Sequence, residues 1–281
     1  MAVEAPSGPA PEVAVVGLGL IGGSLALALG ARGFDSDPEA RRRAREKGIA
    51  VFETLEEAVA GARFVVASVS TEATVRLLPE LAEAAPGAIL SDSASLKVPV
   101  VAAASSLPAH VRFVGGHPMA GSPVRGIDGA RPGLFAGRPW VLTPTPRSDE
   151  ASLLAVAGLV RRTGAVPFVW EAQRQDEAMT WISHFPHAMA AVMAVVFGRR
   201  TDREAVSLSG PGLLDMTRLA GAPPGLQAEL LLARPDALAS LLDEAAEGAR
   251  GLAAALRRGD DEAVRALLAE AAASRREIEG R

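Results

Sequence analysis

One histidine stands in a segment whose residue types suit proton transfer, Gly115-Gly116-His117-Pro118-Met119-Ala120-Gly121-Ser122. The segment follows the run Val111 to Val114, which is typical of a strand leaving a core. Imidazole is the side chain best suited to moving a proton near neutral pH. The glycines predict a flexible turn that a ligand can approach closely. Taken alone, His117 is more typical of a turn residue than of a catalyst, so the elements around it must decide.

A second glycine-rich segment, Gly17-Leu18-Gly19-Leu20-Ile21-Gly22, lies between the apolar run Val13 to Val16 and a helical run from Ser24 to Leu29. A strand before and a helix after are the setting in which this pattern binds a dinucleotide. In order, its glycines make a tight turn, let the backbone reach the pyrophosphate, and allow close packing of helix on strand. The helix N-terminus then faces the anion. The alternative is a purely structural glycine turn.

An acidic residue is expected at the end of the second strand, about 20 residues further on. Asp35 is the candidate for holding the ribose hydroxyls, and its charge favours NAD over NADP because it would repel a 2′-phosphate. Asp35 comes early and follows no Val/Ile run, so either the first helix or the second strand should be short. Asp35 or Asp37 could also cap the helix that begins near Pro38.

Strand and helix patterns alternate along the first part of the chain, with buried strands predicted at Phe64 to Ala67 and Ala88 to Leu90. This alternation predicts an α/β fold, a Rossmann-like, doubly wound and mostly parallel sheet with helices on both faces. We expect a flexible tail at residues 1–11, a dinucleotide-binding domain at residues 12–170, and an all-helical substrate-binding and dimerisation domain at residues 171–281.

Hydroxyl groups and an acid follow the strand that ends at Leu90, in the segment Ser91-Asp92-Ser93-Ala94-Ser95-Leu96-Lys97. Carboxyl ends of parallel strands share one edge of a sheet, which is where ligands bind. Ser95 could therefore hydrogen-bond a neighbouring imidazole and fix its tautomer. It could also cap a helix from Leu96 to Ser105.

The later part of the chain is predicted to be helical. Ala178 to Phe197 is apolar on nearly all sides, as expected of a helix in a core or a dimer interface. His184 and His187 share one face of this helix, and Pro186 should distort it. The two histidines could be metal ligands or could pack in a helix interface. Because no acidic or Cys partner has suitable spacing, no metal is expected.

Arg218, in Asp215-Met216-Thr217-Arg218, is a candidate for holding a carboxylate through two hydrogen bonds. It could instead pair with Asp215.

Composition narrows the chemistry further. The 281 residues are 49% hydrophobic, which is ample for a core, and the net charge of −4 argues against nucleic-acid binding. There is no Cys, which excludes disulfides and thiolate nucleophiles, and no Tyr, which excludes a phenol as acid or base. No apolar run is expected to span a bilayer without interruption, and no signal peptide is expected. We therefore expect a cytoplasmic protein. Of the four histidines, His110 is expected at the surface.

Five segments, taken in order, resemble the prephenate/arogenate dehydrogenase family of tyrosine biosynthesis over about residues 13–235. The segments are Gly17-Leu18-Gly19-Leu20-Ile21-Gly22-Gly23-Ser24, Ser91-Asp92-Ser93-Ala94-Ser95-Leu96-Lys97, Gly115-Gly116-His117-Pro118-Met119-Ala120-Gly121-Ser122, Ile182-Ser183-His184-Phe185-Pro186-His187 and Asp215-Met216-Thr217-Arg218. The third and fourth are far more specific than the glycine pattern.

The resemblance implies NAD-dependent oxidative decarboxylation of prephenate to 4-hydroxyphenylpyruvate, with NADP the less expected cofactor. It implies that His117 takes the proton of the ring hydroxyl and that Ser95 positions this histidine near the nicotinamide. The residues implied in substrate binding are His187, its supporting neighbour His184, Arg218 and Ser122. We further expect a homodimer through the helical domain.

Several positions depart from the family pattern, and they leave arogenate open as the substrate. They are Pro123, Gln175-Asp176, Leu214 and Gly225-Leu226-Gln227. A β-hydroxyacid dehydrogenase or an imine-reducing relative is a further alternative, although the Lys base usual in the hydroxyacid enzymes is missing between Ala178 and Phe197. A non-catalytic dinucleotide-binding protein is the last alternative.

Overall fold

The computed structural model describes residues 12–122, 124–146, 148–199 and 202–280. Contacts divide the chain into two compact units, of which the first ends at Ala178 and the second begins at Met179. The expected tail at residues 1–11 and Pro123 lie outside the described residues. The domain boundary expected after residue 170 stays a prediction.

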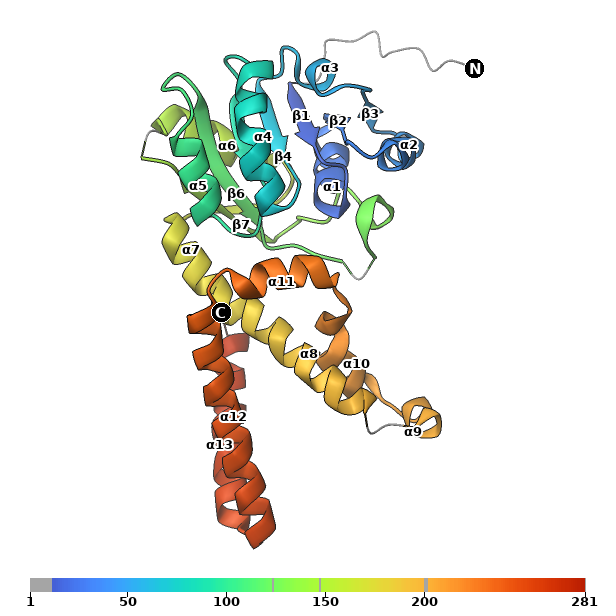
Figure 1. Cartoon of the computed structure of the whole chain (residues 1–281), viewed down its shortest axis with the longest axis vertical. Coiled ribbons are helices and arrows are strands. Elements are labelled where there is room, and N and C mark those ends of the chain that lie inside the picture. Colours follow the sequence, from blue (N-terminus) through green and yellow to red (C-terminus); the bar gives the residue numbers. More distant parts are fainter. Residues whose placement is uncertain (1–11, 123, 147, 200–201, 281) are drawn as a thin grey trace. The chain divides into compact units, whose positions relative to one another are not determined.

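The first unit is built on an eight-stranded sheet with the order β3-β2-β1-β4-β5-β6-β7-β8 (Figure 1). The strands are β1 (Val13–Val16), β2 (Arg32–Phe34), β3 (Ala50–Val51), β4 (Phe64–Ala67), β5 (Ile89–Asp92), β6 (Arg112–Pro118), β7 (Pro139–Pro144) and β8 (Val166–Val169). Neighbouring strands pair in parallel except β6 and β7, which are antiparallel. The predicted, mostly parallel sheet is confirmed.

Helices cover both faces of this sheet. They are α1 (Leu20–Leu29), α2 (Pro38–Glu46), α3 (Leu55–Val59), α4 (Thr71–Ala84), α5 (Val98–Ser105) and α6 (Glu150–Arg162), with a 3₁₀ turn η1 (Gly126–Gly129). Alternate side chains of a strand point to opposite faces. Val13 and Val15 of β1 therefore pack in a core with α1, α2 and α6, whereas Ala14 and Val16 pack in a second core with α3, α4 and α5. The doubly wound arrangement follows from strands that are apolar on both sides.

The segment Gly115-Gly116 is part of strand β6, so the prediction of a flexible turn is wrong. Neither glycine has a positive φ. A Cβ on Gly115 would lie 2.3 Å from Oγ1 of Thr143, and one on Gly116 would lie 2.6 Å from the carbonyl oxygen of Asp92. These glycines are required because neighbouring atoms leave no room for a side chain. His117 follows them inside the strand, one residue before its end.

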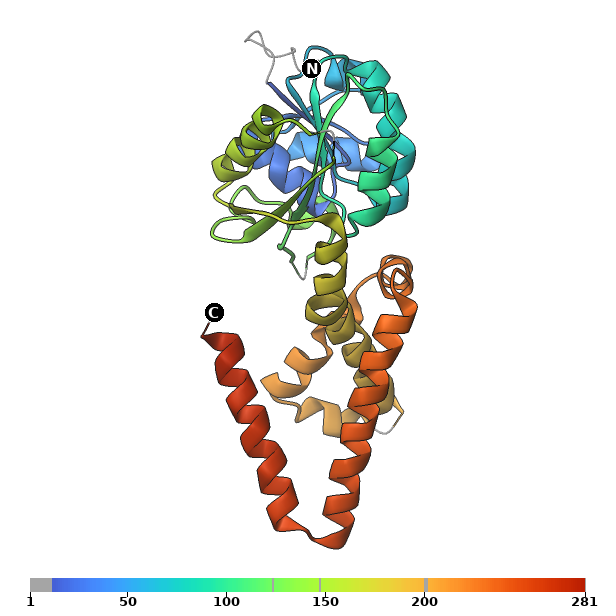
Figure 2. The same cartoon turned by 90° about the vertical axis from the view of Figure 1, so that its left-hand side faces the viewer.

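In the described residues, every regular element from Ala172 onwards is helical, as predicted for the C-terminal part. The elements are α7 (Ala172–Met179), a π-helical turn η2 (Thr180–His184), α8 (Phe185–Gly198), α9 (Arg203–Ser207), α10 (Pro211–Thr217), a 3₁₀ turn η3 (Arg218–Gly221), α11 (Pro224–Leu232), α12 (Pro235–Arg258) and α13 (Asp261–Glu279). Helices α12 and α13 form a long hairpin, which Figure 2 shows from the side. The hairpin turns at Gly259, whose φ is 65°.

Pro186 distorts the long helix as predicted. Proline lacks a backbone N–H and cannot continue the regular ladder of hydrogen bonds. One residue earlier, the Phe185 N–H donates to the carbonyl of Thr180, five residues back, which closes a π-helical turn. Such turns are rare in proteins as a whole, but those that occur are often found at functional sites. Here the turn ends at His184.

Residues Ala172–Gly198 form one continuous helix of 27 residues, and one 18-residue window in it has a mean hydropathy of 1.3. By length and composition it could cross a membrane, which corrects the expectation that no apolar run is long enough. One such helix is weak evidence, because the core helix of a soluble protein has the same properties.

Candidate active site

The carboxyl ends of the parallel strands bring the predicted groups of the first unit to one edge of the sheet. Gly17 follows β1, Asp35 follows β2, Ser68 follows β4, Ser93 follows β5 and His117 lies at the end of β6. The order of strands reverses between β1 and β4. This reversal is where open α/β sheets bind their ligands. His117 and the glycine segment therefore share the expected edge.

The three glycines of the pattern after β1 differ in what a side chain at each position would contact. Gly17 has a φ of +96°, and a Cβ there would lie 2.4 Å from the Ser68 carbonyl oxygen. A Cβ on Gly22 would lie 1.9 Å from the Gly17 carbonyl oxygen, so this glycine lets helix α1 pack against the turn. A Cβ on Gly19 would meet no atom within 4 Å. Gly19 thus faces open space at the N-terminus of α1.

That N-terminus has the properties of an anion-binding site. Gly19 is the N-cap of α1, no side chain caps the helix, and its first turn contains no acidic residue. The first backbone N–H groups of a helix need partners and carry partial positive charge. Leu18, in contrast, turns its fully buried side chain into the core, whereas Leu20 and Ile21 pack partly buried against it.

The Asp35 carboxylate bridges two loops at the end of β2. Its Oδ2 accepts from the Leu18 N–H at 2.7 Å and its Oδ1 from the Asp37 N–H at 2.9 Å. Asp37, not Asp35, caps α2 by accepting from the Glu39 N–H. β2 is the shortened element, with only three residues. Asp35 follows this short strand and holds the glycine segment in place through the bond from Leu18.

Asp35 also lines a pocket of about 180 Å³ at this edge. The other lining residues are Val16, Gly17, Phe34, Ser36, Val69, Ala73 and Leu77. The lining is apolar apart from Ser36, Asp35 and backbone groups, and it comes from the ends of β1, β2 and β4 and from α4. An apolar cleft beside one carboxylate suits a flat heterocycle joined to a sugar.

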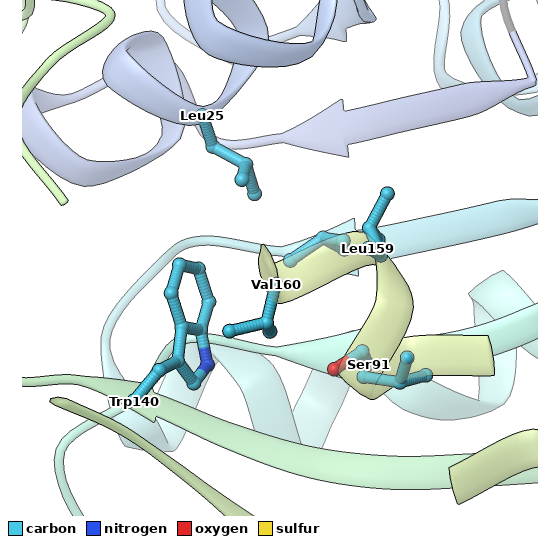
Figure 3. Close-up of a pocket in the computed structure, with 7 residues that line it drawn as sticks. Leu25, Ser91, Trp140, Leu159 and Val160 are labelled. Carbon is cyan, nitrogen blue, oxygen red and sulfur yellow. The ribbon is translucent and has the colours of Figure 1, made fainter. Parts of the chain in front are cut away.

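A second cavity lies inside the core and is not a ligand site. It measures about 10 Å³ and is lined by Leu25, Val66, Ser91, Trp140, Val156, Leu159 and Val160 (Figure 3). A volume of about 10–15 Å³ holds at most a single water molecule. The cavity is therefore a small packing gap between α1, α6 and the sheet.

Ser95 does not cap a helix, so that alternative is wrong. Helix α5 begins at Val98. Its N-terminus is held instead by Asp176 of α7, whose two carboxylate oxygens accept from the Lys97 N–H at 2.7 Å and the Val98 N–H at 2.9 Å. The buried side chain of Gln175 donates to the Ser95 carbonyl at 3.2 Å. The bond expected from the Ser95 hydroxyl to an imidazole stays a prediction.

A buried ion pair that the sequence motifs do not predict lies beside the segment that carries His117. Lys97 pairs with Asp92, and neither side chain is exposed to solvent. Both also bind the backbone of Gly116, the residue before His117. Burial lowers the pKa of Lys97, while the neighbouring carboxylate of Asp92 opposes that shift. The sequence offered a signal, an acid at the end of a buried strand and a lysine five residues later, but charged residues there are equally typical of a surface loop.

The second unit holds the two paired histidines. Nδ1 of His187 lies 2.9 Å from the carbonyl of Ser183. A carbonyl oxygen can only accept, so Nδ1 of His187 carries a proton and donates this bond. His187 is half-buried and His184 is buried. Desolvation lowers the pKa of His184 to about 4, with a smaller contribution from the neighbouring His187. His184 is therefore neutral at pH 7.

This shift predicts a pH-dependent stability. In the unfolded chain the pKa of His184 returns to 6.5, so the unfolded state binds a proton that the folded state refuses. Stability from His184 is complete above pH 6.5 and falls as the pH drops from 6.5 to 4, by about 3 kcal/mol. In urea unfolding followed by circular dichroism at pH 7 and pH 4.5, His184→Gln should lose less stability than the wild type. Equal losses would contradict the buried neutral state.

Arg218 and Ser122 remain candidates for substrate binding. Arg218 is exposed at the start of η3, and within the described part of the chain no ion pair joins it to Asp215. Ser122 is half-buried and accepts from the Val124 N–H at 3.2 Å. His110 is exposed, as predicted. Within residues 12–122, 124–146, 148–199 and 202–280, no group of three or more His, Asp and Glu could hold a metal ion.

Fold and site together define a dinucleotide-binding α/β domain joined to a helical domain, the architecture of a class of dehydrogenases. The chain belongs to the prephenate dehydrogenase family. Residues 29–169 match the family's nucleotide-binding domain and residues 171–270 match its dimerization domain. The family named from the sequence motifs is confirmed.

Three similar proteins illustrate the relationship. Prephenate dehydrogenase of Bacillus subtilis is 31% identical over 249 residues, which cover 83% of this chain and 66% of that protein, just under two thirds of its length. Prephenate dehydrogenase of Aquifex aeolicus, solved in complex with hydroxyphenyl propionate and NAD+, has a TM-score of 0.80 and 26% identity, covering 97% of this chain and 100% of that one. Arogenate dehydrogenase of Synechocystis has a TM-score of 0.74 and 26% identity, covering 95% and 99%.

Proposed function

We propose that this protein catalyses the NAD+-dependent oxidative decarboxylation of prephenate to 4-hydroxyphenylpyruvate. The observation that carries the proposal is His117 at the carboxyl end of β6, on the same sheet edge as the glycine turn and Asp35. A base and a dinucleotide site on one edge are what oxidation of an alcohol requires. Family membership supports the same reaction.

His117 acts as the general base in this proposal. It takes the proton of the ring hydroxyl while the hydride leaves the same carbon. The ring carboxylate then departs as CO₂. Its bonding electrons pass through the ring to the carbonyl oxygen, which makes the ring aromatic, and this oxygen takes the proton back from His117. Imidazole suits this step because it can both take up and release a proton near neutral pH. Ser95 is proposed to position His117.

The residues at the edge fit an NAD+ molecule. Open space at Gly19 and the uncapped N-terminus of α1 suit the pyrophosphate. Asp35 suits the ribose hydroxyls and would repel a 2′-phosphate. The nearby Arg41, which could attract such a phosphate, donates to the Asp35 carbonyl at 2.7 Å and pairs with Glu53 at 3.3 Å. When bound, NAD+ supplies the hydride acceptor. NADP+ is therefore the less favoured cofactor.

Prephenate carries two carboxylates, so substrate binding calls for hydrogen-bond donors and a cation. We assign this binding to Arg218, to His187, with His184 as its neutral support, and to Ser122. An arginine can hold a carboxylate through two parallel hydrogen bonds.

Arg218→Ala should raise the KM for prephenate by about 10-fold to 100-fold and change kcat less, because ground-state and transition-state binding are lost together. Steady-state kinetics at saturating NAD+ measure both. Arg250→Ala is a matched control, since Arg250 is an exposed arginine of α12 that pairs with Glu247. An unaltered KM in Arg218→Ala would remove Arg218 from the site.

Arogenate is the second candidate substrate, because the arogenate dehydrogenase of Synechocystis has the same fold over almost the whole chain. The decisive experiment compares prephenate and arogenate, each with NAD+ and NADP+, by the absorbance of the reduced cofactor. We expect prephenate with NAD+ to give the highest kcat/KM. Lack of turnover with both substrates, despite measured NAD+ binding, would overturn the proposed function and favour a non-catalytic dinucleotide-binding protein.

We also propose that the protein is a cytoplasmic homodimer formed through the helical part. The match to a dimerization domain supports this assembly. Helix α8 exposes Val192, Val195, Val196 and Phe197, an apolar surface of the kind that subunit interfaces cover.

A further inference from the structure

Strand β6 continues beyond the end of its parallel partner. β5 and β6 pair at three positions, the last of which joins Ser91 to Val114. Two residues further along β6, side chains replace the missing strand. Oδ1 of Asp92 accepts from the Gly116 N–H at 3.0 Å, and Nζ of Lys97 donates to the Gly116 carbonyl at 2.7 Å. This carbonyl belongs to the peptide group that joins Gly116 to His117.

The ion pair that makes these bonds is costly. Asp92 and Lys97 are both 0% exposed, and they pair with each other. Removing two charges from water costs much of what their attraction returns, so well-packed apolar residues are often as stable or more stable. Stability alone is therefore a poor reason for this pair. Charge-assisted hydrogen bonds are about twice as strong as neutral ones, and here they hold both polar groups of Gly116.

Surrounding atoms leave the held backbone little freedom to move. A Cβ on Gly116 would lie 2.6 Å from the Asp92 carbonyl oxygen and 2.8 Å from Nε1 of Trp140. The pair is itself fixed, because Oδ2 of Asp92 accepts from the Ala94 N–H at 2.9 Å and Asp176 accepts from the Lys97 N–H. Gly116 is thus held by hydrogen bonds at its N–H and its carbonyl, with no room for a side chain at its Cα.

We propose that the buried Asp92–Lys97 pair is a positioning device, which fixes Gly116 and thereby aims the imidazole of His117 at the substrate hydroxyl. The inference rests on the proposed function of His117 as the base. Lys97 is fully buried and its ammonium donates to the Gly116 carbonyl, so we place its action on the backbone. A displacement of about 1 Å in a reacting group can cost about 100-fold in rate, which makes such a device valuable.

The test variant is Asp92→Asn/Lys97→Met, which removes the ammonium without leaving a charge unpaired. Asn keeps an acceptor for the Gly116 N–H, and Met replaces the lysine stem. We expect kcat to fall by about 10-fold to 100-fold while the KM and the Kd for NAD+ change by less than about threefold. With substrate deuterated at the carbinol carbon, the kinetic isotope effect on kcat should rise, because hydride transfer becomes slower than product release.

Arg32→Met is the matched control. Arg32 is another buried cation that donates to a backbone carbonyl, that of Ala60 at 2.9 Å, but it lies in β2, which β1, β4 and β5 separate from β6. The Arg32→Met variant should be less stable than the wild type but should have the same kcat and the same isotope effect. Equal kcat in both variants, measured below their melting temperatures, would overturn the positioning role. If the double variant does not fold, Asp92→Asn alone serves, with an expected loss in kcat of about threefold to tenfold.

A readout without substrate separates this inference from the proposed function. The ring signals of His117 in ¹⁵N-resolved NMR should shift in Asp92→Asn/Lys97→Met and stay in place in Arg32→Met, with the exposed His110 as internal reference. If the wild type turns over neither prephenate nor arogenate, the proposed function fails. The NMR measurement still shows whether the Asp92–Lys97 pair positions His117. Unshifted His117 signals would overturn it.

Discussion

His117→Asn is expected to lower kcat by at least ~100-fold, the usual contribution of a general base, while the Kd for NAD+ stays within about twofold of the wild type. The asparagine amide has a size close to that of part of the imidazole but cannot accept a proton near neutral pH. His117 is half-buried at the end of β6, so the replacement leaves no large cavity. Single-turnover formation of NADH measures the chemical step, and a fluorescence titration measures NAD+ binding.

His110→Asn provides the comparison for this variant. His110 is exposed in the loop before β6, and its replacement should leave kcat, KM and NAD+ affinity unchanged. The pH profile adds a second criterion. In the wild type, kcat/KM should fall at low pH as the base takes up a proton, and His117→Asn should lose that dependence. A variant that kept both the rate and the acidic limb would assign the base to another residue.

The residues that meet at the carboxyl edge of the sheet are predictable from sequence because their position follows from topology. Once strands and helices alternate, the residues after each strand must meet at one edge. That argument predicts that the glycine turn and His117 share one edge, and the structure agrees. Gly22 is predicted to allow close packing of the helix on the strand, and in the structure it lets the helix pack against the turn at Gly17.

Local patterns failed where distant residues decide the conformation. Gly115 and Gly116 look like a turn, but contacts from Thr143 and Asp92 make them part of a strand. Ser95 looks like a helix cap, but the carboxylate of Asp176, 79 residues after Lys97, holds that helix. No local pattern contains such long-range partners. The pairing of Lys97 with Asp92 was missed for a related reason, because burial of a charge depends on what packs over it.

The second large effect is expected at Gly22. Its replacement by alanine would place a methyl group 1.9 Å from the Gly17 carbonyl oxygen and 2.9 Å from Cβ of Ser68. Both neighbours are backbone or short side chain and cannot turn away. Helix α1 must therefore shift, at a cost of about 3 kcal/mol or more in stability. Because the shift moves the N-terminus of α1, the Kd for NAD+ should rise by about 100-fold or more.

Gly19→Ala separates cofactor contact from packing. A methyl group there meets no protein atom within 4 Å, so thermal denaturation should show stability within about 0.5 kcal/mol of the wild type. If the pyrophosphate approaches this backbone, the same methyl group should raise the Kd for NAD+ by at least about tenfold, measured by calorimetry. Gly158→Ala in α6, which also meets no atom within 4 Å, should affect neither NAD+ binding nor kcat. Normal NAD+ affinity in Gly19→Ala would mean that the pyrophosphate lies elsewhere, and the assignment of the whole glycine turn would have to be revised.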